Sequence, residues 1–170
     1  MLRPVVPALL LVAQSLSAQQ PTVPLYTDLG PHHRTITTRV PQAQQYFDQG
    51  LRLVYGFNHA EAIRSFTRAT ELDPTCAMCW WGIAYALGPH VNAGMDSASG
   101  VRAHAAAQRA LTASRNAAAW ERAYVAAVAA RYAPVPPADR APLDSAYARA
   151  MGAVAREHPD DLDAQALYAE

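Results

Sequence analysis

Small and apolar side chains recur along residues 42–57 at the three- and four-residue spacing of one helix face. These positions are Tyr46, Phe47, Gly50, Leu51, Leu53, Val54 and Tyr55. A second pattern of the same period covers residues 60–72, and Asn58 lies between the two at a turn position. Pro41 opens the first pattern and Pro74 follows the second, as is common at helix boundaries. The chain therefore predicts two antiparallel helices joined by a short turn.

The same arrangement of residues returns 34 positions later. The matching pairs are Tyr46 and Trp80, Gln49 and Ile83, Gly50 and Ala84, and Leu53 and Leu87. The first copy is completed by Ala62, Phe66, Ala69 and Pro74. A single helical hairpin of this length cannot bury its apolar side alone and has to pack on a neighbouring hairpin. The repeat therefore predicts a stack of hairpins.

This pattern resembles the tetratricopeptide repeat (TPR), in which W-x2-L-G-x2-Y, A-x3-F and P are spread over 34 residues. Here Tyr46 stands in place of the Trp, Gln49 in place of the Leu and Leu53 in place of the Tyr. The resemblance implies an all-α, right-handed solenoid of antiparallel helix hairpins over residues 42–170. It also implies that the first helix of each hairpin lines a concave groove that binds peptides.

Later parts of the chain follow the pattern less completely. The expected helices cover residues 76–87 and 101–113 in the second copy, a segment around Trp120 and residues 143–157 in the third, and residues 162–168 in a fourth. An insert rich in Gly, Asn and Ser, residues 88–100, interrupts the second copy. Because the pattern stops inside a helix, we expect about three hairpins plus the start of a fourth, in a truncated piece of a longer repeat array.

The first residues have the character of a secretory signal. Arg3 precedes an apolar run at residues 5–13, and small residues follow up to Ala18. The run is too short to span a bilayer. We therefore expect residues 1–18 to be a signal peptide and the mature protein to be exported, to a periplasm or outside the cell. A cytoplasmic protein with an apolar N-terminus is the alternative, because Pro4 and Pro7 interrupt the run.

A segment rich in Pro and Thr connects this signal to the first helix. Residues 19–41 carry Pro21, Pro24, Pro31 and Pro41, which disfavour a helix. We expect an extended segment that lies on the helical domain or links it to the signal. The adjacent His32 and His33 within it are expected to be solvated, with only a weak case for metal binding.

Composition narrows the classes of function. The chain has 170 residues, of which 51% are hydrophobic, and this is enough for one domain with a core. Its 14 basic residues, all Arg, balance 14 acidic residues, so no general attraction to nucleic acid or anionic membrane is expected. The sequence has no Gly-rich phosphate loop, nucleophile elbow or HExxH motif. We therefore expect a protein without enzymatic activity and without a cofactor.

The first helices carry an apolar stripe that the core of a repeat does not require. We predict that a protein or peptide binds to an apolar and aromatic surface made by Phe47, Leu51, Tyr55, Trp81 and Tyr85. By register with the TPR, Gln44 is a further groove position. TPR proteins that clamp a terminal carboxylate use Lys, Arg and Asn at such positions, and these are missing here. Alternatively, residues 19–42 or further repeats cover the stripe, since large exposed aromatic patches are rare.

Cys76 and Cys79 form the only cysteine pair, at the expected start of the third helix. Thiols at this spacing can approach closely enough to bond, and export favours the oxidised state. A helix N-terminus also lowers the pKa of a thiol, which leaves a redox function open. Haem attachment requires a His where this chain has Trp80, and a zinc site requires two more ligands than the pair supplies. We favour a structural disulfide.

The sequence thus predicts an exported, non-catalytic interaction scaffold of the TPR type with a protein or peptide partner. The alternative function is that of a redox or metal-handling protein centred on Cys76 and Cys79. Self-association is a further option, because an uncapped repeat end exposes apolar surface. Acidic residues such as Asp160 and Asp161 are interpreted as solvated side chains near a helix end.

Overall fold

The computed structural model describes residues 23–169, and this part of the chain is all-α, with no strand. Its helices are α1 (Pro41–Tyr55), α2 (His59–Leu72), α3 (Ala77–Ala86), α4 (Ser97–Ala113), the short 3-10 helix η1 (Ser114–Asn116), α5 (Ala119–Ala129), α6 (Ala141–Glu157) and α7 (Leu162–Ala169). The prediction of an all-α protein is confirmed for these residues. The predicted signal peptide, residues 1–18, lies outside them. None of the helices described here combines the length and hydrophobicity that a membrane span requires.

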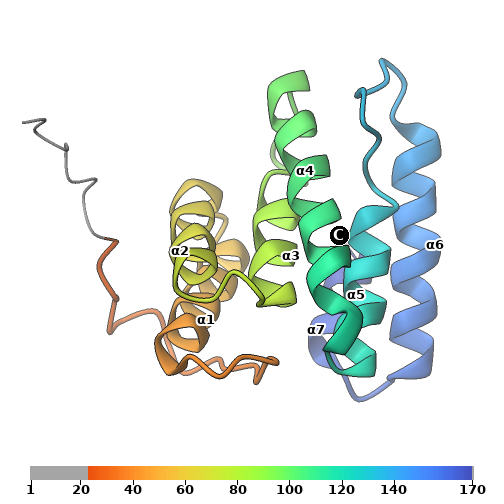
Figure 1. Ribbon diagram of the computed structural model, residues 1–170. Helices are drawn as coiled ribbons and strands as arrows, with labels where there is room; N and C mark the ends of the chain where they lie inside the picture. Colours follow the sequence, from red (N-terminus) through yellow and green to blue (C-terminus); the bar gives the residue numbers. More distant parts are fainter. Residues whose placement is uncertain (1–22, 170) are drawn as a thin grey trace, which may run out of the picture.

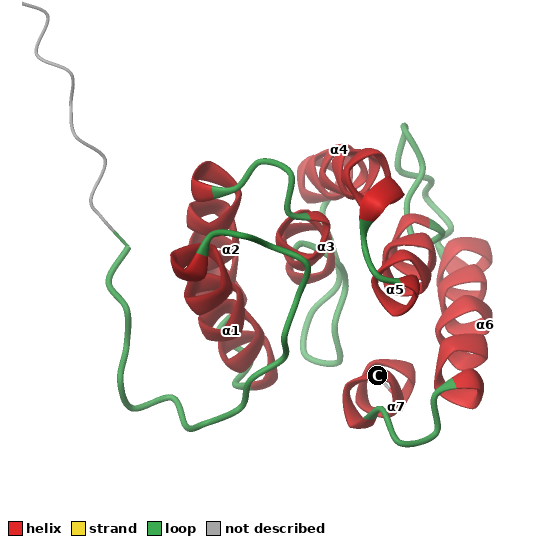
Figure 2. Ribbon diagram, turned by 60° about the horizontal axis from the view of Figure 1, so that its bottom comes forward, coloured by secondary structure: helices red, strands yellow, loops and turns green. Residues whose placement is uncertain are grey.

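The helices pack in the order of the sequence. Each α-helix contacts the next one along the chain, and α3 also contacts α1 and α5. In Figure 1, the overlapping pair of α1 and α2 is followed across the molecule by α3, α4, α5 and α6. Figure 2 shows that these six helices form an arc, with α7 and the later part of the extended residues 23–40 on its inner side. The first residues of that segment run past α1 at the end of the arc, where Tyr46 and Gln49 bind them. We call residues 23–40 the strap and the side of the arc on which α7 lies the inner face.

Several helices begin where a side chain accepts a hydrogen bond from a backbone N–H of the first turn. The side-chain oxygen of Asn58 accepts from the backbone N–H of Glu61 at the start of α2. Asp96 Oδ1 accepts from the backbone N–H of Ser99, at 2.7 Å. This cap explains why α4 begins at Ser97, four residues before the start predicted at residue 101. Asp161 Oδ1 accepts from the backbone N–H of Ala164 at 3.1 Å, at the start of α7.

The ring of Phe66 in α2 is enclosed by glycines of two other helices. A Cβ atom at Gly50 of α1 would lie only 2.6 Å from this ring, and a Cβ at Gly82 of α3 would also collide with it. Phe66 is completely buried. The absence of side chains at both glycines therefore lets α1 and α3 approach the two sides of the ring, as close packing requires.

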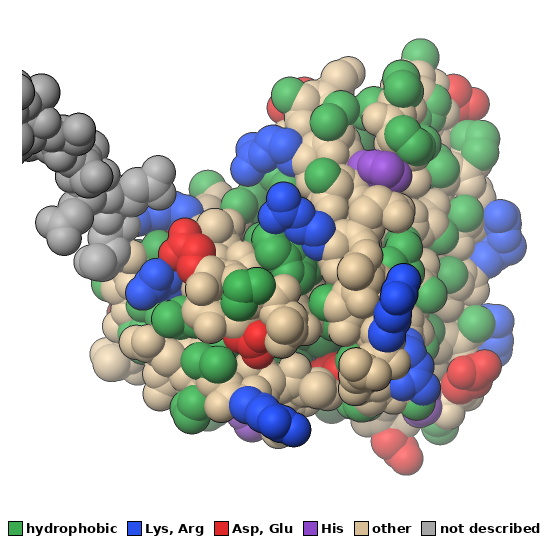
Figure 3. Space-filling view, in the orientation of Figure 1, with side chains coloured by type: hydrophobic (Ala, Val, Ile, Leu, Met, Phe, Trp, Pro, Cys, Tyr) green, Lys and Arg blue, Asp and Glu red, His purple; other side chains and the backbone are tan. Residues whose placement is uncertain are grey.

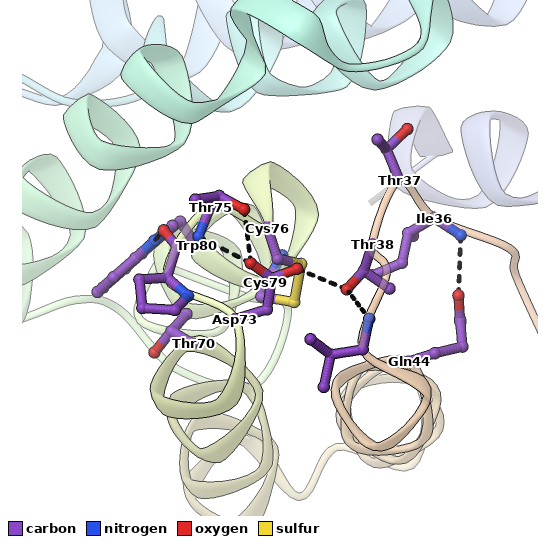
Figure 4. Close-up of a disulfide and its surroundings, with 12 residues drawn as sticks. Ile36, Thr37, Thr38, Gln44, Thr70, Asp73, Thr75, Cys76, Cys79 and Trp80 are labelled. Carbon is purple, nitrogen blue, oxygen red and sulfur yellow. Dashed lines mark hydrogen bonds between the residues drawn. A yellow bond between two sulfur atoms is a disulfide. The ribbon is translucent and has the colours of Figure 1, made fainter.

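Cys76 and Cys79 are joined by a disulfide at the start of α3, and both residues are completely buried. Figure 4 shows this disulfide beside the turn between α2 and α3. In that turn, Asp73 Oδ1 accepts hydrogen bonds from the backbone N–H and the hydroxyl of Thr75. The disulfide and the Asp73 hydrogen bonds together hold the turn from which α3 begins.

Candidate functional site

The backbone of the strap is held by polar side chains that lie one turn apart on α1. These side chains are Gln44, Asp48 and Arg52, and we call them the backbone ladder. Arg52 Nε donates to the carbonyl oxygen of His32 at 2.6 Å, and Asp48 Oδ1 accepts from the backbone N–H of Arg34 at 3.1 Å. Gln44 accepts from the backbone N–H of Ile36 at 3.0 Å and donates to the carbonyl oxygen of Arg34 at 2.9 Å.

The geometry of the ladder follows from two regular spacings. Residues four apart on a helix are separated by about 6 Å along its axis. Every second residue of an extended chain is separated by about 6.6 Å. Because the two spacings nearly match, successive ladder residues can contact residues 32, 34 and 36 of the strap. Since the contacts are to backbone atoms, this arrangement binds an extended segment largely without regard to its side chains.

One side chain of the strap, Arg34, is enclosed by two carboxylates and two aromatic rings. Arg34 Nη1 donates to Asp163 Oδ2 at 2.7 Å, and Arg34 Nη1 and Nη2 donate to the two oxygens of Asp161, both at 2.7 Å. The guanidinium carbon lies 4.0 Å from the ring centre of Trp120 and 4.7 Å from that of Tyr124. We call these four residues the arginine cage. Its paired carboxylates and flat rings match the charge and the planar shape of a guanidinium.

Two tyrosine hydroxyls complete the cage. Tyr55 Oη donates to Asp163 Oδ1 at 2.6 Å, and Tyr124 Oη donates to Asp161 Oδ2 at 2.8 Å. Burial raises the pKa of Tyr55, and the hydrogen bond with Asp163 raises it further. Burial likewise raises the pKa of Tyr124, against the opposing charge of Arg34. Both hydroxyls therefore stay protonated and orient the carboxylates toward Arg34.

The charges within the cage stabilise one another. Burial alone would lower the pKa of Arg34, but its hydrogen bonds to Asp161 and Asp163 outweigh this and raise it. Burial alone would raise the pKa of Asp161, but hydrogen bonds from Arg34 and Tyr124 outweigh this and lower it to about 2. At neutral pH the guanidinium and the Asp161 carboxylate are therefore both charged.

The rest of the strap is anchored beyond the cage. Glu121 of α5 is buried, and its Oε1 accepts a hydrogen bond from the backbone N–H of Thr37. The hydroxyl of Thr38 donates to Asp73, beside the disulfide (Figure 4). Ile36 is only 5% exposed and belongs to the hydrophobic core. The strap is thus held by α1, α5 and α7 and by the turn before α3.

The structure places four of the five predicted groove residues in the core. Phe47, Leu51, Trp81 and Tyr85 are between 0% and 4% exposed, and Trp81 stacks on Tyr85 with ring centres 5.3 Å apart. They share one buried cluster with Ile36 of the strap and Leu167 of α7. Tyr55 alone is 37% exposed, at the edge of the inner face. The stripe is therefore covered within the chain, by the strap and α7, which is the second of the two arrangements that the sequence left open.

No known family model, curated protein or solved structure matches this chain.

The sequence did not reveal the charged half of this site. Asp161 was interpreted as a solvated residue at a helix end; it does cap α7, but it also binds Arg34. His32 and His33 were expected to be solvated, and both are exposed. Each also contacts a carboxylate: His32 Nε2 lies 3.1 Å from Asp163 Oδ1, and His33 Nδ1 lies 2.7 Å from Asp48 Oδ2. The sequence does show an Asp-x-Asp spacing at Asp161 and Asp163, at the start of α7, but nothing in it links this pair to Arg34 rather than to another arginine.

The cysteine pair is bonded and is not part of the arginine cage. Because both cysteines are completely buried, a redox partner has no direct access to either sulfur in this conformation. Within residues 23–169, no three residues among His, Cys, Asp and Glu are grouped so that they could hold a metal ion.

Proposed function

We propose that this protein is a non-catalytic interaction scaffold of the TPR type, whose inner face binds an extended protein segment. The observation that carries the proposal is the backbone ladder, which holds a segment of this kind at every second residue. Helix α1 packs on α2, α3 on α4 and α5 on α6, which is consistent with three hairpins of a solenoid. Helix α7 would then be the first helix of a fourth hairpin. In this view the strap is an intramolecular ligand.

The side chains of the strap indicate which partner sequence would fit. The arginine cage accepts a guanidinium, and the buried site of Ile36 accepts an aliphatic side chain two residues later. A partner segment with an Arg-x-aliphatic spacing would therefore make the contacts of Arg34 and Ile36 while the ladder holds its backbone. Lys would be a poorer occupant, because it cannot form the two-point contact or stack flat on the rings.

Such a partner has to compete with a ligand that belongs to the same chain. A tethered segment acts at an effective concentration on the order of millimolar. Binding is thus weak unless the strap is released or the partner makes further contacts. The buried disulfide fits an oxidising compartment, so we also propose that the protein acts outside the cytosol, as an exported protein would.

A labelled peptide with the sequence of residues 30–40 tests the proposal by fluorescence anisotropy. The chain carrying Arg34→Ala, in which the cage is vacated, should bind this peptide at least tenfold more tightly than the unaltered chain does. A peptide with Lys in place of the arginine should bind the variant about tenfold more weakly. Adding Asp163→Asn to the variant should weaken binding as well.

Circular dichroism would establish that the variant chains remain helical. If the folded Arg34→Ala chain does not bind the peptide, the inner face is a purely intramolecular packing surface and the proposal is wrong. Equal binding of peptides with and without the arginine would also contradict it, because the cage would then select nothing.

A further inference from the structure

A hollow lies on the side of the arc opposite the strap. It runs between α2 and α4, both of which pack on α3, and its volume is about 560 Å³. Trp80, Ile83 and Leu87 line its floor, Glu71 stands on the α2 side, and Arg102 and Arg109 stand on the α4 side. We call this hollow the outer groove. Figure 3 shows hydrophobic side chains inside it and basic side chains along the edge formed by α4.

The floor of the groove follows from the sequence of α3. This helix, AMCWWGIAYA, has apolar or small residues on every side, and a helix of this kind has to be covered all round. Its inner side is covered by the core. On its outer side the indole of Trp80 is half-buried. Another hollow, of about 620 Å³, adjoins the outer groove at Trp80. The outer groove thus presents apolar surface beside Trp80 that the described residues leave partly open.

The α4 side of the groove carries two arginines that no described carboxylate pairs with. Arg102 and Arg109 are both exposed, and neither has a carboxylate of residues 23–169 within ion-pair distance. Asp96 interacts with Arg102 only at longer range. Glu71, across the groove, is neutralised by Arg68 at 2.8 Å. The charge that remains in the groove is therefore positive and lies along α4.

The spacing along α4 indicates the shape of a matching ligand. Arg102 and Arg109 are seven residues apart, which places them on one face about 10.5 Å apart along the axis. The small residues Ala105 and Ala106 lie between them and also line the groove. A second helix can approach closely over such small side chains. A carboxylate on that helix would meet each arginine if two acidic residues were also seven positions apart.

We propose that the outer groove binds an acidic amphipathic helix of a partner protein. The helix lies along α4 with Glu or Asp at positions i and i+7, paired with Arg102 and Arg109. Its apolar residues at i+3 and i+4 rest on Ala105, Ala106 and the ring of Trp80. Arg109 already lies over that ring, 4.7 Å from its centre, so the aromatic and the charged contacts form one continuous surface. This site is independent of the inner face.

The test uses a synthetic helical peptide with the pattern Glu-x-x-Leu-Leu-x-x-Glu. A second peptide, of reversed charge, has Lys at both Glu positions. Anisotropy with the full chain should show binding of the acidic peptide and at least tenfold weaker binding of the Lys peptide. Affinity for the acidic peptide should fall as salt is raised, because the ion pairs are exposed. The Arg34→Ala change in the strap should leave this affinity unchanged.

Charge reversal in the groove provides the decisive comparison. In the double variant Arg102→Glu and Arg109→Glu, the acidic peptide should lose tenfold or more in affinity and the Lys peptide should gain at least as much. Arg149→Glu is the matched control, because Arg149 is an exposed arginine on the distant helix α6. If the acidic peptide does not bind the unaltered chain, the proposal is wrong. Equal effects of the groove and control reversals would equally overturn it, as would tighter binding of an acidic peptide that contains helix-breaking prolines.

Discussion

Arg34 and Asp161 lie 127 positions apart in the sequence and are joined by two parallel hydrogen bonds, each 2.7 Å long. This two-point contact connects the strap before the first helix to the cap of the last helix. Because Asp161 also fixes the start of α7, the strap and α7 hold each other in place against the inner face. The loss of either side chain should therefore destabilise both the strap and α7, at the two ends of the described chain.

The change Arg34→Ala should lower the free energy of unfolding by about 2–3 kcal/mol, because it leaves two partly buried carboxylates without the guanidinium that balances their charge. Thermal unfolding followed by circular dichroism measures this loss. Arg39→Ala is the control, since Arg39 is an exposed strap residue, and it should change stability by less than about 0.5 kcal/mol. Equal effects of the two changes would mean that the cage contributes nothing to the fold.

Acid should release the strap before it unfolds the rest of the domain. The pKa of Asp161 is lowered from 3.8 to about 2, because hydrogen bonds from Arg34 and Tyr124 outweigh the effect of burial. A lowered carboxyl pKa adds stability that is present above about pH 4 and is lost as the pH falls toward 2. Hydrogen bonds from Thr38 and Thr75 lower the pKa of Asp73 in the same direction, against burial. The Asp161 contribution is on the order of 1 kcal/mol after allowance for solvent screening.

Hydrogen exchange of the strap amides between pH 5 and about pH 2 would follow this release. Asp161→Asn should remove most of the dependence of strap protection on pH, whereas Asp144→Asn, at an exposed ion pair on α6, should not. If strap protection follows the same pH curve in both variants, the Asp161 carboxylate does not control the strap.

The helices could be predicted from the sequence because their signals are local. The apolar period of α1 and α2 and the 34-residue spacing from Tyr46 to Trp80 depend only on neighbouring residues and on one repeat length. The early start of α4 was missed because its cap, Asp96, lies in a segment rich in Gly, Asn and Ser that reads as a loop. Element existence was thus easier to predict than element boundaries.

The site was only half predictable for a different reason. The inward-facing stripe that includes Phe47 and Trp81 follows from helical period, but whether water reaches it depends on what folds over it. That cover is provided by the contact of Arg34 with Asp161 and Asp163, across more than a hundred residues. An arginine in an extended segment carries no local sign of its partner, so periodicity and spacing could not place the strap on the inner face.

Packing around Phe66 leads to a third prediction. Gly50→Ala should destabilise the domain by about 1–3 kcal/mol through overpacking against the ring, although Ala is normally favoured over Gly in a helix by about 1 kcal/mol. Gly94→Ala is the control, because a Cβ there would meet no atom within 4 Å. In the double variant with Phe66→Leu the two losses should be less than additive. Full additivity in a denaturant titration would show that Gly50 and Phe66 do not share the contact.

The buried disulfide leads to a final prediction about access. Because Cys76 and Cys79 are bonded and completely buried, the folded protein should react with no thiol reagent, and reductant alone should expose the thiols only slowly. Reductant together with denaturant should release two thiols per chain at once. Replacing both cysteines by Ser should cost about 2 kcal/mol, since closing so short a loop removes little entropy from the unfolded chain. Mass spectrometry of the labelled protein measures the thiols, and rapid labelling of the folded protein by reagent and reductant would contradict the burial of the pair and reopen a redox function.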